Sequence, residues 1–169
     1  LEIEGNFVQE GGWPFVSNSE EFTLLFSGEK ESTVNFGNLD YYKSNLEIAK
    51  GKKIRTDTGF SAGNLIGDSD IFQVDGDIPY LNITNPIEKD LTIKADNIKQ
   101  LTVSVNSGKL KLNGQFENPG NVVINKSGTI EITGDAITGS GTIDNRGGLF
   151  EVDGDLRLQN KNEDGSYGY

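Results

Sequence analysis

Short runs of alternating apolar and polar residues recur along this chain, with turn-forming residues between them. Three of these runs end in glycine and lie 20 residues apart: Leu110 to Gly114, Ile130 to Gly134 and Phe150 to Gly154. A second glycine column, at positions 108, 128 and 148, keeps the same step. Alternation with a period of two places one set of side chains on each face of a pleated strand. The pattern therefore predicts short β-strands repeated at a fixed period.

The repeat extends toward the N-terminus, where the first apolar residue of each unit recurs at 72, 91, 110, 130 and 150. Each unit holds two further apolar runs, one beginning near Ile78 or Ile98 and one near Leu81 or Leu101. The opening Leu1–Phe7 repeats the motif, and Leu46–Ala49 is a shorter echo of it. Each period of about 20 residues thus provides three short strands, which can close one coil around an apolar axis.

The predicted fold is all-β, a parallel β-helix or β-solenoid with coils of about 20 residues and three short strands each. About eight coils stacked at roughly 4.8 Å would form a rod about 40 Å long. Leu112, Ile132 and Val152 are expected to be buried and stacked on one another. The glycines after each strand are expected to supply the positive φ of a sharp corner. Asn106, Asn125 and Asn145 are expected to form a partial ladder along one edge.

The whole chain, residues 1–169, reads as a single solenoid segment of a longer repetitive protein. Residues 1–67 are expected to form less regular coils with larger loops, and residues 68–160 to form the regular coils. Residues 161–169 are polar and rich in turn formers, which is typical of a linker. Adjacent repeats of the same chain, or end-to-end self-association, would then cover the edge of the last coil.

The amino-acid composition limits which catalytic and metal-binding sites the chain can form. The chain contains no Cys, His or Met, which removes the ligands and bases of most transition-metal and nucleophilic sites. A net charge of −11, from 26 acidic and 15 basic residues, opposes binding to nucleic acid and to anionic membranes. No apolar stretch is long enough for membrane insertion. The sequence favours a role without catalysis.

Pairs of aspartates are the candidates that remain for ion binding or acid–base chemistry. Asp68 and Asp70 flank one serine, and Asp75 and Asp77 flank one glycine. Asp153 and Asp155 flank another glycine and are a third candidate pair for acid–base chemistry alone. Carboxylates this close on loops suit a hard cation, so Ca²⁺ is the one cofactor that the sequence suggests beside the expectation of none. Turn chemistry is the first explanation of these residues, because aspartate and glycine are both turn formers. A carbohydrate-active enzyme using such pairs is the least favoured alternative.

Exposed aromatic side chains are the candidates for binding a polysaccharide, because an aromatic face can stack on a sugar ring. Trp13 is the single tryptophan and lies in a Gly-Gly-Trp-Pro-Phe segment. Tyr41, Tyr42 and Tyr80 complete this candidate set. For Trp13, the competing interpretation is a plug that covers one end of the solenoid core.

Several segments resemble large repetitive cell-surface proteins of Clostridia and related Firmicutes. The resemblance rests on LEIEGNFVQEGG, TLLFSGEKESTVNF and SNLEIAKGKKI in the first third, and on LRLQNKNEDGSYGY at the end. It implies a wall-associated or secreted protein of tandem units, with no enzymatic residues to carry over. A looser likeness, of architecture alone, is to β-helical cellulose-adhering surface proteins of thermophilic Firmicutes.

The sequence therefore predicts a non-catalytic structural or adhesive module at a bacterial cell surface, outside the cell. Its expected partner is a host or substrate surface, which includes polysaccharide. A polysaccharide-binding module is the main alternative.

Overall fold

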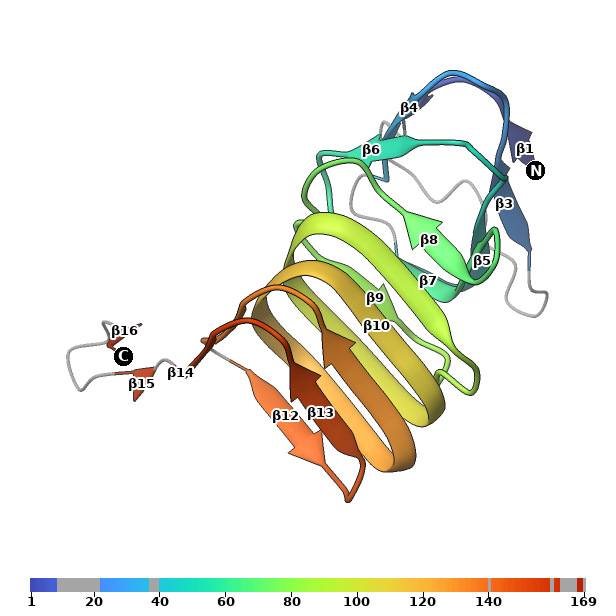
Figure 1. The fold of residues 1–169 in the computed structure, drawn as a ribbon. Coiled ribbons are helices and arrows are strands. Elements are labelled where there is room, and N and C mark those ends of the chain that lie inside the picture. Colours follow the sequence, from blue (N-terminus) through green and yellow to red (C-terminus); the bar gives the residue numbers. More distant parts are fainter. Residues whose placement is uncertain (9–21, 37–39, 140, 159, 162–166, 169) are drawn as a thin grey trace.

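The computed structural model describes residues 1–8, 22–36, 40–139, 141–158, 160–161 and 167–168, and the statements below concern these residues. Their regular elements are strands, which wind into about six stacked turns of a β-solenoid, with successive turns about 21 residues apart. Figure 1 shows the chain advancing along the stack from the N-terminal coils to the C-terminal coils. The predicted all-β parallel solenoid is confirmed.

The structure has about six turns, not the predicted eight, and the step between coils varies along the stack. Glu2 pairs with Leu25, and Leu25 pairs with Glu47, so these steps take 23 and 22 residues. In contrast, Glu131 pairs with Glu151 after 20 residues.

The strands of the N-terminal half are short and separate. They are β1 (Glu2–Ile3), β2 (Phe7–Val8), β3 (Thr23–Phe26), β4 (Ser32–Asn35), β5 (Asp40–Ile48), β6 (Ile54–Thr56), β7 (Phe60–Gly67), β8 (Ile71–Gln73) and β9 (Leu81–Ile83). The long β10 (Leu91–Ile132) winds through the centre of the solenoid and bends at its corners without a break. The remaining strands are β11 (Ala136–Thr138), β12 (Thr142–Asn145), β13 (Leu149–Val152), β14 (Leu156–Leu158), β15 (Asn160–Lys161) and β16 (Tyr167–Gly168).

Pairing between coils is parallel, as a solenoid requires. One sheet follows the order β1-β3-β5-β7-β9-β10-β11-β14, with β8, β12 and β13 also paired to β10, and a second sheet consists of β2, β4 and β6. The strands β15 and β16 form a separate antiparallel pair. The strands of each coil are therefore hydrogen-bonded in parallel to strands of the preceding coil.

The predicted apolar columns of the later coils are present. Ile132 lies beside Val152 in register, and the N–H of Thr133 donates to the carbonyl of Leu112, which joins the preceding coil. Leu112 and Ile132 are buried, as predicted. Val152 is only half-buried and packs against the core from the last coil, so its predicted full burial is wrong.

The predicted alignment of Phe72 with Leu91 is wrong by two residues. Phe72 pairs with Ile93, and Ile71 pairs with Thr92. A shift of two residues leaves every side chain on its original face, so alternation alone does not determine it. β8 follows a tight turn in which Ser69 and Asp70 both have positive φ, 54° and 61°.

The opening motif is also placed differently from the prediction. Leu1–Ile3 and Leu46–Ile48 belong to one strand path, on either side of β3. Phe150–Val152 pairs instead with the end of β10, in the path that β8 begins. Similar sequences therefore occupy different sides of the solenoid.

The core follows the axis of the stack. Its buried apolar side chains form one cluster that runs from Leu24 to Ala136. In the N-terminal half a series of phenylalanines forms the axis, with ring centroids 6.3 Å apart for Phe26 and Phe36, 4.9 Å for Phe36 and Phe60, and 6.3 Å for Phe60 and Phe72. In the later coils the buried core is mainly aliphatic, with Phe116 as its one fully buried phenylalanine among the described residues.

The expected positive φ at every corner glycine is only partly correct. Gly76 and Gly114 have φ of 95° and 146°, but neither Gly134 nor Gly154 is in this region. Gly134 is required for a different reason, because a Cβ there would lie 2.5 Å from the carbonyl oxygen of Gly114 in the preceding coil. Close approach of stacked backbones explains this glycine column.

The asparagine ladder is present for one step. Nδ2 of Asn125 donates to Oδ1 of Asn106 over 2.6 Å. Asn145 does not continue it, because it pairs with Ile124 and its Oδ1 accepts from the N–H of Gly147. A second step of the same kind joins Asn64 to Asn45 over 2.7 Å.

Candidate functional site: charged column and polar corner

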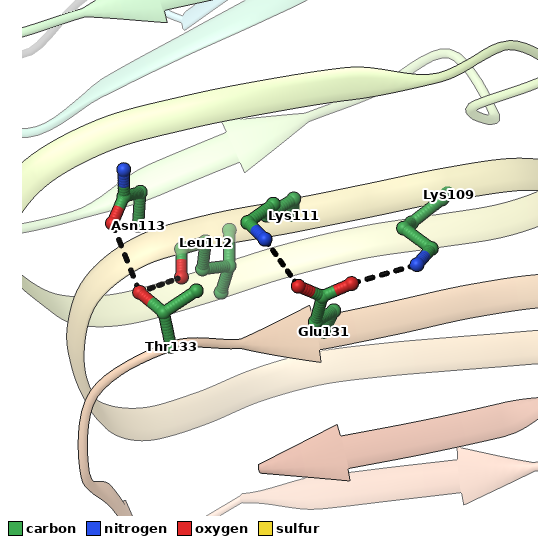
Figure 2. A network of polar contacts seen from close by, with 6 residues as sticks. All are labelled: Lys109, Lys111, Leu112, Asn113, Glu131 and Thr133. Carbon is green, nitrogen blue, oxygen red and sulfur yellow. Dashed lines mark hydrogen bonds and ion pairs between the residues drawn. The ribbon is translucent and has the colours of Figure 1, made fainter. Parts of the chain in front are cut away.

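A column of charged side chains lies on the outer face of the central coils (Figure 2). Lys109 and Lys111 alternate with the buried Leu110 and Leu112, so they point outward. Both ammonium groups contact the carboxylate of Glu131 in the next coil, and the Lys109 Nζ lies 2.7 Å from Oε2. These ion pairs join two successive coils.

The electrostatic state of this column follows from its geometry. Hydrogen bonds from Lys109 and Lys111 lower the pKa of Glu131 from its ordinary value of 4.5 to about 2. The same bond to Glu131 raises the pKa of Lys109. The carboxylate thus stays charged at any pH near neutrality.

The neighbouring corner is a shallow polar groove of about 700 Å³. Asn113 and Thr133 line it, and the hydroxyl of Thr133 donates to Oδ1 of Asn113 over 2.9 Å (Figure 2). The other lining residues are Asp77, Ala95, Asp96, Asn97, Gly114, Gln115 and Gly134. Nearly all polar atoms here are carboxylate, amide or hydroxyl groups, which suit hydroxylated or cationic ligands.

Asn97 is the buried member of this corner. Its side-chain amide donates to a carboxylate oxygen of Glu117 in the following coil. Its Oδ1 is buried and has no hydrogen-bond partner among the described residues. The oxygen is covered by protein atoms, so it does not open into the groove.

The four candidate aspartates have different surroundings in the structure. Asp68 and Asp70 are exposed and flank the turn at Ser69. The carboxylate of Asp75 lies 3.7 Å from Arg55, and that of Asp77 lies 3.0 Å from Lys99. Among the described residues, no three His, Cys, Asp or Glu side chains gather closely enough to hold a metal ion. Calcium binding at these residues stays a prediction.

The aromatic candidates are not gathered into one described surface. Trp13 lies outside the described residues, and Tyr41 and Tyr42 belong to β5 without described side chains. Tyr80 is half-buried, and its carbonyl accepts from the N–H of Phe60 over 2.8 Å. The polysaccharide site therefore stays a prediction.

A buried lysine was not found by the sequence reasoning. Lys52 is only 3% exposed, and its Nζ donates to the carbonyls of Glu4 and Lys30 over 3.1 Å and 2.6 Å. It therefore connects the corners of three coils. In the sequence it is one of two adjacent lysines in a glycine-containing turn, which gives no sign of burial.

No family model, curated protein or solved structure matches the chain. Within the described ranges, no helix is long and apolar enough to cross a membrane.

Proposed function

We propose that this chain is a structural and adhesive β-solenoid module without catalytic activity, belonging to a bacterial cell-surface or secreted protein. The observation that carries the proposal is the use of outward polar side chains to join one coil to the next. The Lys111–Glu131, Thr133–Asn113 and Asn125–Asn106 contacts each span 19 or 20 residues, which is one coil.

These contacts between coils support the proposed role as a structural spacer. Polar groups arranged between coils add to the parallel backbone pairing and the continuous core, and each repeat is stabilised mainly by its neighbours. A catalytic site would need a nucleophile or acid–base pair converging on a pocket. Asp75 and Asp77, the acidic pair with ion-pair partners, each face a separate cation.

Incubation with cell-wall and plant polysaccharides, with and without Ca²⁺, tests the absence of catalysis. The proposal expects no release of reducing or unsaturated sugar. Turnover that disappears in Asp75→Asn or Asp77→Asn would contradict it.

Retention on insoluble polysaccharide separates a spacer from a polysaccharide-binding module. A spacer is not retained, or is retained equally after substitution of its aromatic residues. Retention that is lost in Trp13→Ala, Tyr41→Ala or Tyr42→Ala, but kept in the outer-column variant Lys111→Ala, would establish binding through aromatic stacking.

A further inference from the structure

Two successive coils separate along one stretch in the middle of the stack. The last backbone bond before the gap runs from the N–H of Asn85 to the carbonyl of Gly63. Backbone bonding between the same two coils resumes where the N–H of Thr92 donates to the carbonyl of Asp70. Between these two bonds, no backbone pairing joins the coils among the described residues.

A cleft of about 410 Å³ lies in this gap. The end of β7, Leu65–Gly67, lines it, and within the described ranges this strand end pairs in parallel with β5 only. Ile66, which is 40% exposed, lines the cleft together with the buried Ile83 and Ile87. A strand edge that is open beside an apolar surface can be extended by an added strand.

The charged lining of the cleft is mostly acidic. Asp70, Glu88 and Asp90 line it against the single Lys89, and all four are exposed. None of the three carboxylates forms an ion pair with a described residue, although the charge of Asp90 helps to raise the pKa of Lys109. The cleft therefore favours a cationic occupant.

The cleft also lies between two runs of the asparagine ladder. On one side Asn64 donates to Asn45, and on the other side Asn106 donates to the carboxylate of Glu88 over 2.9 Å. Oδ1 of Asn64 receives no hydrogen bond from a described residue. Both runs thus end in oxygen acceptors at the cleft, and a ligand rich in hydrogen-bond donors complements them.

We propose that this cleft binds an extended peptide segment that carries an arginine or lysine side chain. The main chain of the segment extends the open edge of β7, its apolar stem lies along Ile66, and its cation contacts Asp70 and Glu88. A neutral saccharide fits less well, because it leaves the carboxylates without a countercharge. The inference rests on the proposed adhesive role and names a partner for it.

The synthetic peptide acetyl-Thr-Val-Arg-Val-Thr-amide tests the proposal on the intact chain. Titration followed by NMR should show saturable shifts at residues 64–70 and 85–91. A peptide with citrulline in place of arginine keeps the shape but lacks the charge, and it should bind at least about threefold more weakly. A peptide with N-methylated backbone amides should also bind more weakly, because it cannot donate to a strand edge.

Variants of the chain test the assigned residues. Asp70→Asn removes one carboxylate and keeps the turn, because asparagine tolerates the positive φ at this position. Combined with Glu88→Gln, it should abolish the preference for arginine over citrulline. Asp68→Asn is the matched control, since Asp68 belongs to the same turn but does not line the cleft, and it should keep the full preference.

Four outcomes would overturn the proposal. They are equal binding of the arginine and citrulline peptides, shifts located elsewhere on the molecule, a preference that survives in the double variant, and binding of free arginine amide as tight as that of the peptide. The last outcome would show that the cleft takes a small cation rather than a segment. Sugar release remains the separate test of the proposed function, so failure of the two can be distinguished.

Discussion

The coil that ends β10 and the last coil contain the same motif on the same face but differ in almost every physical property. Ile130-Glu131-Ile132 lies between two neighbouring coils, with its apolar side chains fully buried and its glutamate bonded to two lysines. Among the described residues, Phe150-Glu151-Val152 pairs with one coil, its apolar side chains are half-buried, and Glu151 forms no ion pair or hydrogen bond, although its charge helps to raise the pKa of Lys109. In a solenoid, the contribution of a residue to the free energy of unfolding depends on the coils on both sides of it.

Truncating a leucine in each region tests this difference most strongly. Leu112→Ala should lower the free energy of unfolding by about 2–5 kcal/mol, because it leaves a cavity in a covered core. Leu156→Ala should cost about 1 kcal/mol or less, because Leu156 is 49% exposed. Urea denaturation measures both, and equal losses would contradict the comparison.

Backbone spacing between covered coils gives the next effect. Gly134→Ala should cost about 1–3 kcal/mol, because the new Cβ would meet the Gly114 carbonyl and force stacked backbones apart. Gly5→Ala is the matched control, since nothing lies within 4 Å of a Cβ there. Thermal midpoints of the two variants should differ, and an unchanged midpoint for Gly134→Ala would show that the coils separate without strain.

The buried Lys52 joins the first coils to one another, so it tests how the N-terminal end of the solenoid is held together. Lys52→Met should cost about 1–3 kcal/mol, because it leaves the carbonyls of Glu4 and Lys30 without their shared donor. Lys53→Met, at the exposed neighbouring position, should have little effect. Faster hydrogen exchange in β1 and β3 of the Lys52 variant alone would confirm that this side chain holds the first coils together.

The smallest expected effect is a dependence on pH that distinguishes the two glutamates. The folded pKa of Glu131, about 2, is below its ordinary value, so its stabilisation is complete above about pH 4.5. It is lost as the pH falls from there toward 2. Glu131→Gln should therefore flatten the stability curve in this range, and Glu151→Gln should not. Denaturant midpoints between pH 2 and 6 measure the difference.

The sequence predicted the regular part of the fold well because glycine and apolar columns at a 20-residue step leave few alternatives. The prediction of the register failed at Phe72, because a shift of two residues preserves the alternation of apolar and polar residues. The proposed division of the chain at residue 67 stays a prediction.

The candidate site was less predictable than the fold. Aspartates and aromatic residues can be found in a sequence. Whether their side chains form one site depends on the corner of the coil at which each residue lies. Asp75 and Asp77 are two residues apart, yet their cations, Arg55 and Lys99, come from different coils. The burial of Lys52 depends on carbonyls 22 and 48 residues away, which no local pattern encodes.

Parallel stacking of successive coils is the central claim, and an engineered disulfide tests it most directly in a chain without cysteine. Glu131→Cys with Glu151→Cys places two cysteines at paired positions of adjacent strands, whose roughly 4.8 Å spacing permits a disulfide. Glu131→Cys with Thr142→Cys is the control, since Thr142 pairs with Asn121 on another strand run. Mass spectrometry after mild oxidation should find an intramolecular disulfide in the first variant and not in the second. Free thiols in both, or crosslinking in the control alone, would contradict the stacked solenoid.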